Sequence, residues 1–194
     1  MPYQLQEIRQ ALSDDPAAFL AQCDQQYQQR ISKAADTILK RRNESPIVLL
    51  SGPSGSGKTT TALKLEEELE RRGISTHTIS LDNYFKTMDR STAPRTPEGD
   101  IDLESPLLLD MDLLDETFTK LTRGEEVIIP KFEFSRQMRN DARGRPLSLG
   151  PNEIAIFEGI HALNDDIAGR HPEATTLYIS ARSNILEGEE LRFK

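Results

Sequence analysis

Residues Gly52 to Thr59 read GPSGSGKT, and the apolar run just before them, Ile47 to Leu50, is typical of a buried strand. This order of strand, glycine-rich turn and helix start is that of the GxxxxGK[ST] phosphate-binding loop. The glycines let successive backbone N–H groups turn inward as an anion-binding nest, and the helix that begins near Lys58 points its positive end at the same place. The sequence therefore predicts a nucleotide triphosphate site.

The residue types around the loop also predict the cofactors, ATP and Mg²⁺. Lys58 is expected to reach the β- and γ-phosphates, Thr59 to offer its hydroxyl to Mg²⁺, and Thr60 to support the α-phosphate. The alternative is a glycine-rich turn that only joins a strand to a helix. Lys58 and Thr59 argue against it, because they stand at the last two positions of the motif. The sequence has no guanine-reading NKxD, which favours adenine. The expected nucleotide contacts are Gly52, Pro53, Ser54, Gly55, Ser56, Gly57, Lys58, Thr59 and Thr60.

Composition narrows the class of protein. The 194 residues suit one α/β domain with an appendage, and the net charge of −8 argues against broad affinity for nucleic acid or anionic membranes. The single cysteine, Cys23, excludes an intramolecular disulfide framework and is expected to pack as a small apolar residue. No apolar run approaches the ~20 residues of a membrane helix, and no signal-peptide pattern is present. We therefore expect a cytoplasmic protein that acts on a small-molecule substrate.

The N-terminal residues differ from the rest and divide the chain into a helical extension, 1–45, and a phosphate-loop domain, 46–194. Ser13, Asp14 and Pro16 are typical of a helix start, and one amphipathic helix should follow. Its apolar stripe can cover the domain core, a second subunit of a homo-oligomer or a domain outside this chain; we expect packing on the core. The apolar positions at helical spacing are Leu20, Cys23, Tyr27, Ile31, Ala34, Ala35, Ile38 and Leu39.

Strands and helices alternate along residues 46–194. Apolar patterns predict strands over 47–50, 76–80, 127–129, 154–157 and 176–179, and helices over 62–69 and 107–122. This alternation predicts an α/β fold of the P-loop NTPase type, a doubly wound parallel sheet with the helical extension at its N-terminus. Ligands of such sheets lie beyond the carboxyl ends of the strands, so the residues that follow each strand are the candidate site residues.

Three such residues follow predicted strands. Asp82, in SLDNYF, is a candidate general base for phosphoryl transfer to an alcohol, with a helix cap or turn as the alternative. Glu158, in FEGIH, is a candidate to hold Mg²⁺ through water, although a structural cap also favours Glu there. Tyr84 is a candidate wall for a sugar or base and equally a candidate core residue.

Two further stretches are candidates for the acceptor site. In IPKFEFSRQMR, Phe132 and Phe134 alternate around Glu133, and Arg139 follows; an acceptor pocket and a half-buried strand with a solvated hairpin both fit. The long polar connection 86–106 carries acidic residues suited to sugar hydroxyls or to a solvated surface.

Five motifs, GPSGSGKTT, SLDNYF, DLESP, IPKFEF followed by Arg139, and FEGIH, occur in the order found in the uridine kinase and phosphoribulokinase group. The chain resembles that group over residues 47–180, most closely the bacterial uridine kinase-like proteins. The resemblance implies ATP-dependent phosphorylation of a ribose-type primary hydroxyl, with Asp82 as the catalytic aspartate. It also implies an acceptor site in which Glu104 binds ribose hydroxyls. In that site Phe132 and Phe134 match positions that line the base pocket, and Arg139 matches an arginine on the substrate side.

Two departures from the group limit what the resemblance implies. Gln137 stands where pyrimidine-specific uridine kinases have histidine, although glutamine can also hydrogen-bond a base. The group continues into an arginine-rich lid, whereas only Arg182 and Arg192 follow the last predicted strand here. We therefore expect a kinase domain, 46–194, truncated before the lid, that keeps nucleotide binding better than turnover. A kinase for another small alcohol, such as pantothenate or a sugar phosphate, and a non-catalytic nucleotide-binding regulatory module remain alternatives. His161 lies nearest the predicted site, and no histidine is assigned a role.

Overall fold

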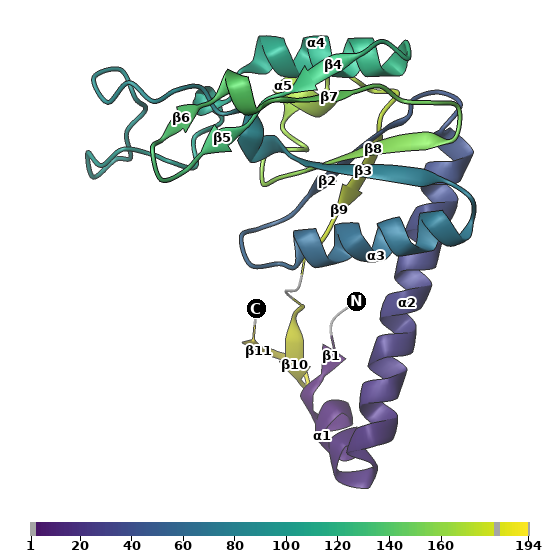
Figure 1. The fold of residues 1–194 in the computed structure, drawn as a ribbon. Coiled ribbons are helices and arrows are strands. Elements are labelled where there is room, and N and C mark those ends of the chain that lie inside the picture. The colour runs from purple at the N-terminus through teal and green to yellow at the C-terminus, as the bar shows by residue number, and fades with distance from the viewer. Residues whose placement is uncertain (1–2, 181–182, 194) are drawn as a thin grey trace.

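A parallel sheet of four strands in the order β3-β8-β2-β9 forms the centre of the molecule (Figure 1). The computed structural model describes residues 3–180 and 183–193. The carboxyl ends of all four strands meet at one edge of the sheet, where the phosphate loop lies (Figure 1). The strands are β2 (Ile47–Ser51), β3 (Ser75–Ser80), β8 (Glu153–Glu158) and β9 (Thr175–Tyr178).

Helices cover both faces of this sheet, because alternate side chains of a strand point to opposite sides. Val48 and Leu50 of β2 pack under α2 (Pro16–Arg41) and α3 (Lys58–Arg71). Ile47 and Leu49 pack in the second core, on the side of α4 (Met111–Thr122). This arrangement of helix, sheet and helix confirms the predicted α/β fold with a doubly wound parallel sheet.

The N-terminal extension contains two helices, where the sequence predicted one. A short helix, α1 (Leu5–Asp14), ends at Asp15, whose extended backbone and side chain then cap α2, accepting a hydrogen bond from the Ala18 N–H at 3.0 Å. Pro16 follows as the first residue of α2, where its missing N–H costs nothing. The break therefore arises from the Asp15–Pro16 pair.

Only the C-terminal half of α2 packs on the core. Ile31, Ala35 and Ile38 are buried against the sheet and α3, as the stripe predicts. Leu20 is 61% exposed, and Cys23 is exposed as well, so the expectation that Cys23 packs as an apolar residue is wrong. The reason is that the first turns of α2 extend beyond the sheet (Figure 1).

The predicted strand at 127–129 forms but does not join the parallel sheet. This strand, β4 (Val127–Ile129), pairs antiparallel with β7 (Arg145–Leu147). A parallel neighbour needs a crossover connection, usually a helix, whereas the chain between β4 and β7 forms a hairpin and a single 3₁₀ turn. Ile128 is 54% exposed, unlike the residues of β2, which are buried on both faces.

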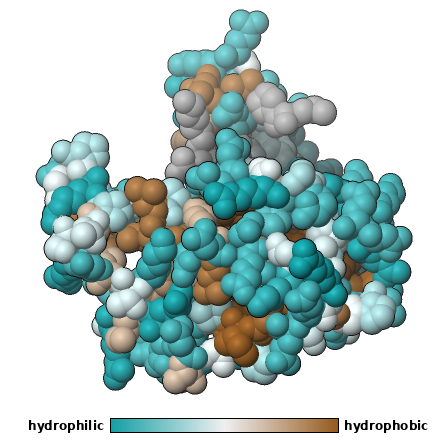
Figure 2. All heavy atoms as spheres, turned by 90° about the horizontal axis from the view of Figure 1, so that it is seen from above, coloured by the Kyte–Doolittle hydropathy of each residue, from teal (hydrophilic) through white to brown (hydrophobic). Residues whose placement is uncertain are grey.

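The remaining elements are short and lie around this centre. The β5–β6 hairpin, 132–139, and the connection 86–106 extend from the carboxyl edge of the sheet, and we call these two segments the lobe (Figure 1). Figure 2 shows the lobe at the left of a largely hydrophilic face. Within the described chain, no helix is both long and apolar enough to span a membrane. The elements are β1 (Tyr3–Gln4), η1 (Leu81–Tyr84), η2 (Pro106–Leu108), β5 (Phe132–Glu133), β6 (Met138–Arg139), η3 (Asp141–Arg143), α5 (Asp165–Ala168), β10 (Ile185–Glu187) and β11 (Glu190–Phe193).

Candidate active site

The phosphate loop connects the buried strand β2 to α3, as the sequence predicts. Gly57 takes a left-handed backbone (φ 85°) directly before Lys58, the first residue of α3, so the free N–H groups of this helix face the loop. The Lys58 ammonium folds back over the loop and donates to the Pro53 carbonyl at 3.0 Å. Thr59 and Thr60 are exposed in the first turn of α3. The loop is therefore open to a ligand on the side of these hydroxyls.

Gly52 is required by close packing rather than by its backbone angles. A Cβ atom at this position would collide with the Ile179 carbonyl oxygen and approach the Ile179 Cγ2 to 2.7 Å. The loop thus lies directly against the end of β9, with no room for a side chain.

We expect Gly52→Ala to lower the free energy of unfolding by about 1–3 kcal/mol, the usual cost of overpacking. Urea denaturation of the variant and the wild type measures the difference. Gly150→Ala is the matched control, since its added Cβ would meet the Glu153 Oε2 at an ordinary 3.5 Å. Equal stability of both variants would contradict the packing argument.

Asp82 and Glu158 lie together at the carboxyl edge of the sheet, next to the loop. Ser80 and Glu158 are paired in the register of β3 and β8, and Asp82 follows two residues after Ser80 in η1. The Ser80 hydroxyl caps this turn by accepting from the Asp82 N–H at 3.4 Å. The Gly159 N–H donates to the Leu50 carbonyl at 3.1 Å, which holds the exit of β8 against β2 and the loop.

Burial and charge set the acidity of these two carboxyls. Burial raises the pKa of Asp82, while the positive charge of Lys58 and the imidazole of His161 act in the opposite direction. Burial also raises the pKa of Glu158, the negative charge of Asp82 raises it further, and Ser80 and Lys58 lower it. Lys58, Asp82 and Glu158 therefore form one electrostatic cluster, as their positions after three strands predict.

His161 and Ser80 are members of this cluster that the sequence did not assign. The buried Nε2 of His161 has no hydrogen-bond partner among the residues of the described chain, and its ring acts on Asp82. The sequence did contain a signal for His161, because it follows Glu158 by three residues, just after a strand. Asp82 was selected by the same rule, that residues after the carboxyl ends of strands are candidate site residues.

The residues predicted for the acceptor site lie in the lobe beside Asp82. The Asn83 side chain accepts from the Phe132 N–H at 3.3 Å, which joins the β5–β6 hairpin to η1. The Gln137 carbonyl accepts from the Met88 N–H at 3.1 Å, so the connection 86–106 packs on the same hairpin. Glu104 is exposed near the end of this connection. Gln137 has a left-handed backbone (φ 51°) at the turn of the hairpin.

Three aromatic candidates differ in what they offer to a ligand. Tyr84 is fully buried and packs against Phe157, so the prediction that it contacts substrate is wrong for this structure, and its alternative as a core residue holds. Phe132 is 6% exposed and packs edge-on against Phe85. Phe134 is 61% exposed and is therefore the aromatic surface of the lobe.

Arg139 is held by two carboxylates. Its guanidinium lies 2.6 Å from the Asp110 carboxylate, with which it forms a charge-assisted hydrogen bond, and 2.9 Å from that of Asp141. Asp110 also caps α4 by accepting from the Leu113 N–H. Arg139 thus fixes the hairpin to α4 and has its charge balanced. Of the two arginines that follow the last predicted strand, Arg182 lies outside the described residues and Arg192 pairs with Glu187 at 2.7 Å in the β10–β11 hairpin.

The donors near the loop fit a magnesium ion. Mg²⁺ in nucleotide sites is held by one or two protein oxygens together with phosphates and water, and Thr59 and Glu158 supply one hydroxyl and one carboxylate. Among residues 3–180 and 183–193, no cluster of three or more His, Cys, Asp or Glu side chains is placed to hold a metal ion. Thr59 and Glu158 are the residues that would hold a metal bound together with a nucleotide.

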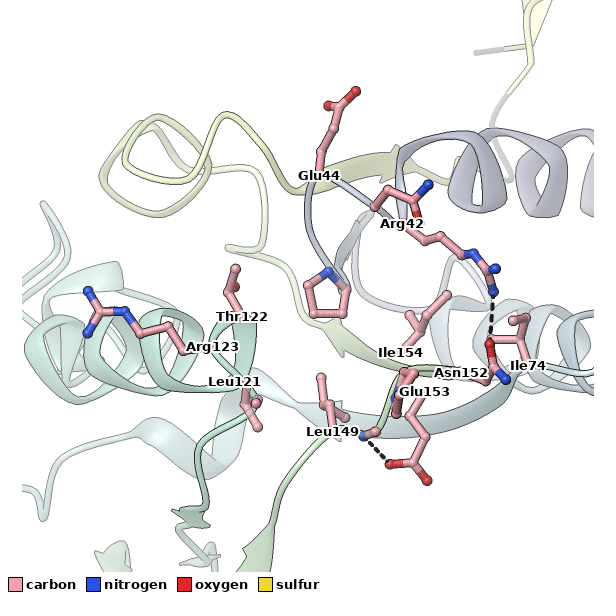
Figure 3. A pocket seen from close by; sticks show the side chains of 15 residues that line it. Arg42, Glu44, Ile74, Leu121, Thr122, Arg123, Leu149, Asn152, Glu153 and Ile154 are labelled. Atoms are coloured by element: carbon pink, nitrogen blue, oxygen red, sulfur yellow. Dashed lines mark hydrogen bonds between the residues drawn. The ribbon is translucent and has the colours of Figure 1, made fainter.

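A separate cavity of about 350 Å³ lies at the opposite edge of the sheet (Figure 3). Pro46, Ile74 and Ile154, which lie at the amino ends of β2, β3 and β8, line it, and Arg42 reaches the Asn152 side chain at its rim at 3.4 Å. None of the predicted site residues lines this cavity. Its position at the amino ends places it away from the phosphate loop.

Comparison with known proteins places the chain among kinases. Residues 47–185 match the model of the phosphoribulokinase/uridine kinase family. The chain is 28% identical over 127 residues to a uridine kinase of Limosilactobacillus reuteri, covering 65% of this chain and 55% of that protein. It is 33% identical over 117 residues to a uridine kinase of Schizosaccharomyces pombe, covering 60% of this chain and 25% of that protein. The chain thus spans about half or less of these relatives.

Solved structures show the same fold. A putative fructose transport system kinase from Silicibacter sp. TM1040 superposes with a TM-score of 0.60 at 22% identity, over 76% of this chain and 73% of that one. A possible uridine kinase from Bacillus stearothermophilus gives a TM-score of 0.53 at 21% identity, over 68% of each chain. Since the family match covers most of the sequence and includes the loop, Asp82 and Glu158, the chain belongs to the phosphoribulokinase/uridine kinase family.

Proposed function

We propose that the chain is the kinase region of an enzyme that transfers the γ-phosphate of ATP to a hydroxyl group of a nucleoside. The observation that carries this proposal is the cluster of Lys58, Asp82 and Glu158 beside the phosphate loop, at the carboxyl ends of β2, β3 and β8. A phosphate cradle with a half-buried carboxylate is the arrangement that phosphoryl transfer to an alcohol uses.

Each residue of the cluster has a role that follows from its chemistry. Asp82 takes the proton of the attacking hydroxyl, and its raised pKa makes it a stronger base than an exposed aspartate. Lys58 lies over the loop, where its charge stabilises the transferring phosphate oxygens. Thr59 and Glu158 would hold Mg²⁺, which would neutralise phosphate charge. Ser80 hydrogen-bonds the Glu158 carboxyl.

The charge of the lobe favours a neutral acceptor over a phosphate-bearing one. Arg139 is paired with Asp110 and Asp141, while Arg136 and Arg143 both lie within 4 Å of the Glu133 carboxylate. The three guanidinium groups face three carboxylates, so together they leave no net positive charge for an anionic substrate. Exposed Phe134 offers a stacking surface to a base, in line with the uridine kinase names of the relatives.

A kinase for another small alcohol is the second candidate. Gln137 favours it, because pyrimidine-specific uridine kinases have histidine at the matching position.

The test is ATP consumption with product identification for a panel of nucleosides, pantothenate and sugar phosphates in the presence of Mg²⁺. We expect phosphorylation of a nucleoside at a primary hydroxyl. Transfer to pantothenate or a sugar phosphate alone would select the second candidate. ATP binding without transfer to any acceptor would point instead to a kinase domain without its lid or to the regulatory module.

A further inference from the structure

A cavity of about 550 Å³ begins where the phosphate loop ends. Gly57 and Thr60 line one side of it, and it continues between α2, α3 and the last residues of β9. Ligand cavities for small molecules have about this volume, 300–1,000 Å³. Since Thr60 is the residue proposed to support the α-phosphate, the nucleoside attached to that phosphate would lie on this side of the loop.

The lining of the cavity suits a planar base with a polar edge. Leu65 from α3, with Leu177 and Ile179 from the end of β9, gives apolar surface. Tyr27 and Arg30 from α2 add a hydroxyl and a guanidinium at the rim. Apolar walls with a few placed polar groups are typical of ligand sites, and a guanidinium can stack on an aromatic ring.

A hydrogen bond between side chains links helix α2 to the start of α3, which follows the phosphate loop. The Tyr27 hydroxyl and the Thr61 hydroxyl are 3.1 Å apart and share a hydrogen bond, which links α2 to the first turn of α3. Arg30 is exposed, and its guanidinium lies at a long 3.4 Å from the Tyr3 hydroxyl. The guanidinium is therefore held weakly and can turn toward a ligand in the cavity.

We propose that this cavity binds the nucleoside half of the donor nucleotide, so that the N-terminal helix α2 forms part of the donor site through Tyr27 and Arg30. Helix α2 lies outside residues 47–185, which match the family model, so this contribution comes from this chain's own extension. The proposal rests on the proposed function, because it takes the phosphates to lie in the loop. It makes the extension a binding element in addition to a cover for the sheet.

The test compares two ligands that share the phosphates and differ in the nucleoside. Titration calorimetry measures the binding of a non-hydrolysable ATP analogue and of inorganic tripolyphosphate, both with Mg²⁺, to the full chain. Ala34 lines the cavity, and Ala34→Trp fills it. We expect this variant to bind the ATP analogue at least tenfold more weakly, with less than a threefold change for tripolyphosphate.

A matched control and a second variant support the comparison. Ala21→Trp places the same side chain on an exposed part of α2 outside the cavity and should change neither affinity. Arg30→Ala removes an exposed side chain, which leaves folding intact, and should weaken the ATP analogue about threefold or more with no effect on tripolyphosphate.

The outcomes separate this inference from the proposed function. Unchanged affinity for the ATP analogue in both Ala34→Trp and Arg30→Ala would overturn the inference, as would equal losses for the two ligands. If the wild-type chain bound neither ligand, the proposed function would fail first, and the inference with it.

Discussion

Lys58→Ala is expected to abolish the stabilisation of the fold by Mg-ATP. A ligand that binds only the folded state at 100 times its dissociation constant stabilises it by about 2.7 kcal/mol. The wild-type chain should show a gain of this size, and the variant almost none, because Lys58 is the cation that lies over the loop, 3.0 Å from the Pro53 carbonyl. Thermal unfolding with and without Mg-ATP, at one fixed nucleotide concentration, measures the gain.

Lys64→Ala is the control for this experiment. Lys64 lies in the same helix, α3, and pairs with Glu67 at 2.8 Å on the surface. Removal of this surface pair should change stability by less than ~1 kcal/mol and leave the nucleotide-dependent gain intact. An equal gain in Lys58→Ala and the wild type would show that nucleotide binds elsewhere than at the phosphate loop.

Asp82→Asn is expected to lower the rate of phosphate transfer by about 10²–10⁴-fold, the usual contribution of a general base. Asparagine keeps the shape of the side chain but cannot take a proton from the acceptor. Affinity for Mg-ATP should stay within a few-fold of the wild type, because Asp82 does not belong to the loop. Steady-state kinetics and calorimetry give the two quantities, and Asp24→Asn, on an exposed part of α2, is the control.

The same variant should stabilise the ligand-free protein near neutral pH. Burial raises the pKa of Asp82 in the folded state, so the folded state disfavours the charged carboxylate relative to the unfolded chain. This cost is absent below the unfolded pKa of about 3.9 and grows as the pH rises through the folded pKa. Asp82→Asn removes the cost.

Unfolding measured across pH checks this sign. The stability difference between Asp82→Asn and the wild type should be positive at pH 7 and shrink as the pH is lowered toward 4. A difference that grows on acidification would mean that the pKa of Asp82 is lowered in the folded state, and that Asp82 is held as an anion by its neighbours.

Local patterns were sufficient to predict the centre of the fold. The run Ile47 to Leu50 followed by GPSGSGKT places a strand, a loop and a helix in consecutive order, and each step is specified by neighbouring residues. Asp82 and Glu158 were predicted to lie close to the loop because parallel strands end at one edge, a rule of topology that needs no side-chain detail.

Properties that depend on contacts distant in sequence were harder to predict. The pairing of β4 with β7 rather than with the parallel sheet depends on the hairpin between them, which the strand pattern at 127–129 does not specify. Tyr84 and Phe134 were both candidates for contact with substrate, yet one is fully buried and the other 61% exposed. Tyr84 packs against Phe157, which is far along the chain.

The acceptor site illustrates the same limit. The sequence placed Arg139 in an acceptor pocket or a solvated hairpin, and the structure pairs it with Asp110 and Asp141. Asp110 was not singled out, because a carboxylate before a helix is typical of a cap, and here it is both a cap and an ion-pair partner.

The central claim is that Asp82 activates a nucleoside hydroxyl for attack on phosphate held by the loop. Its most direct test is the transfer of labelled γ-phosphate from Mg-ATP to a nucleoside, followed in time for the wild-type chain and Asp82→Asn side by side. We predict label on the nucleoside hydroxyl with the wild type, and a rate at least 100-fold lower with the variant. Equal rates in the two proteins, or label released only as free phosphate, would contradict the account.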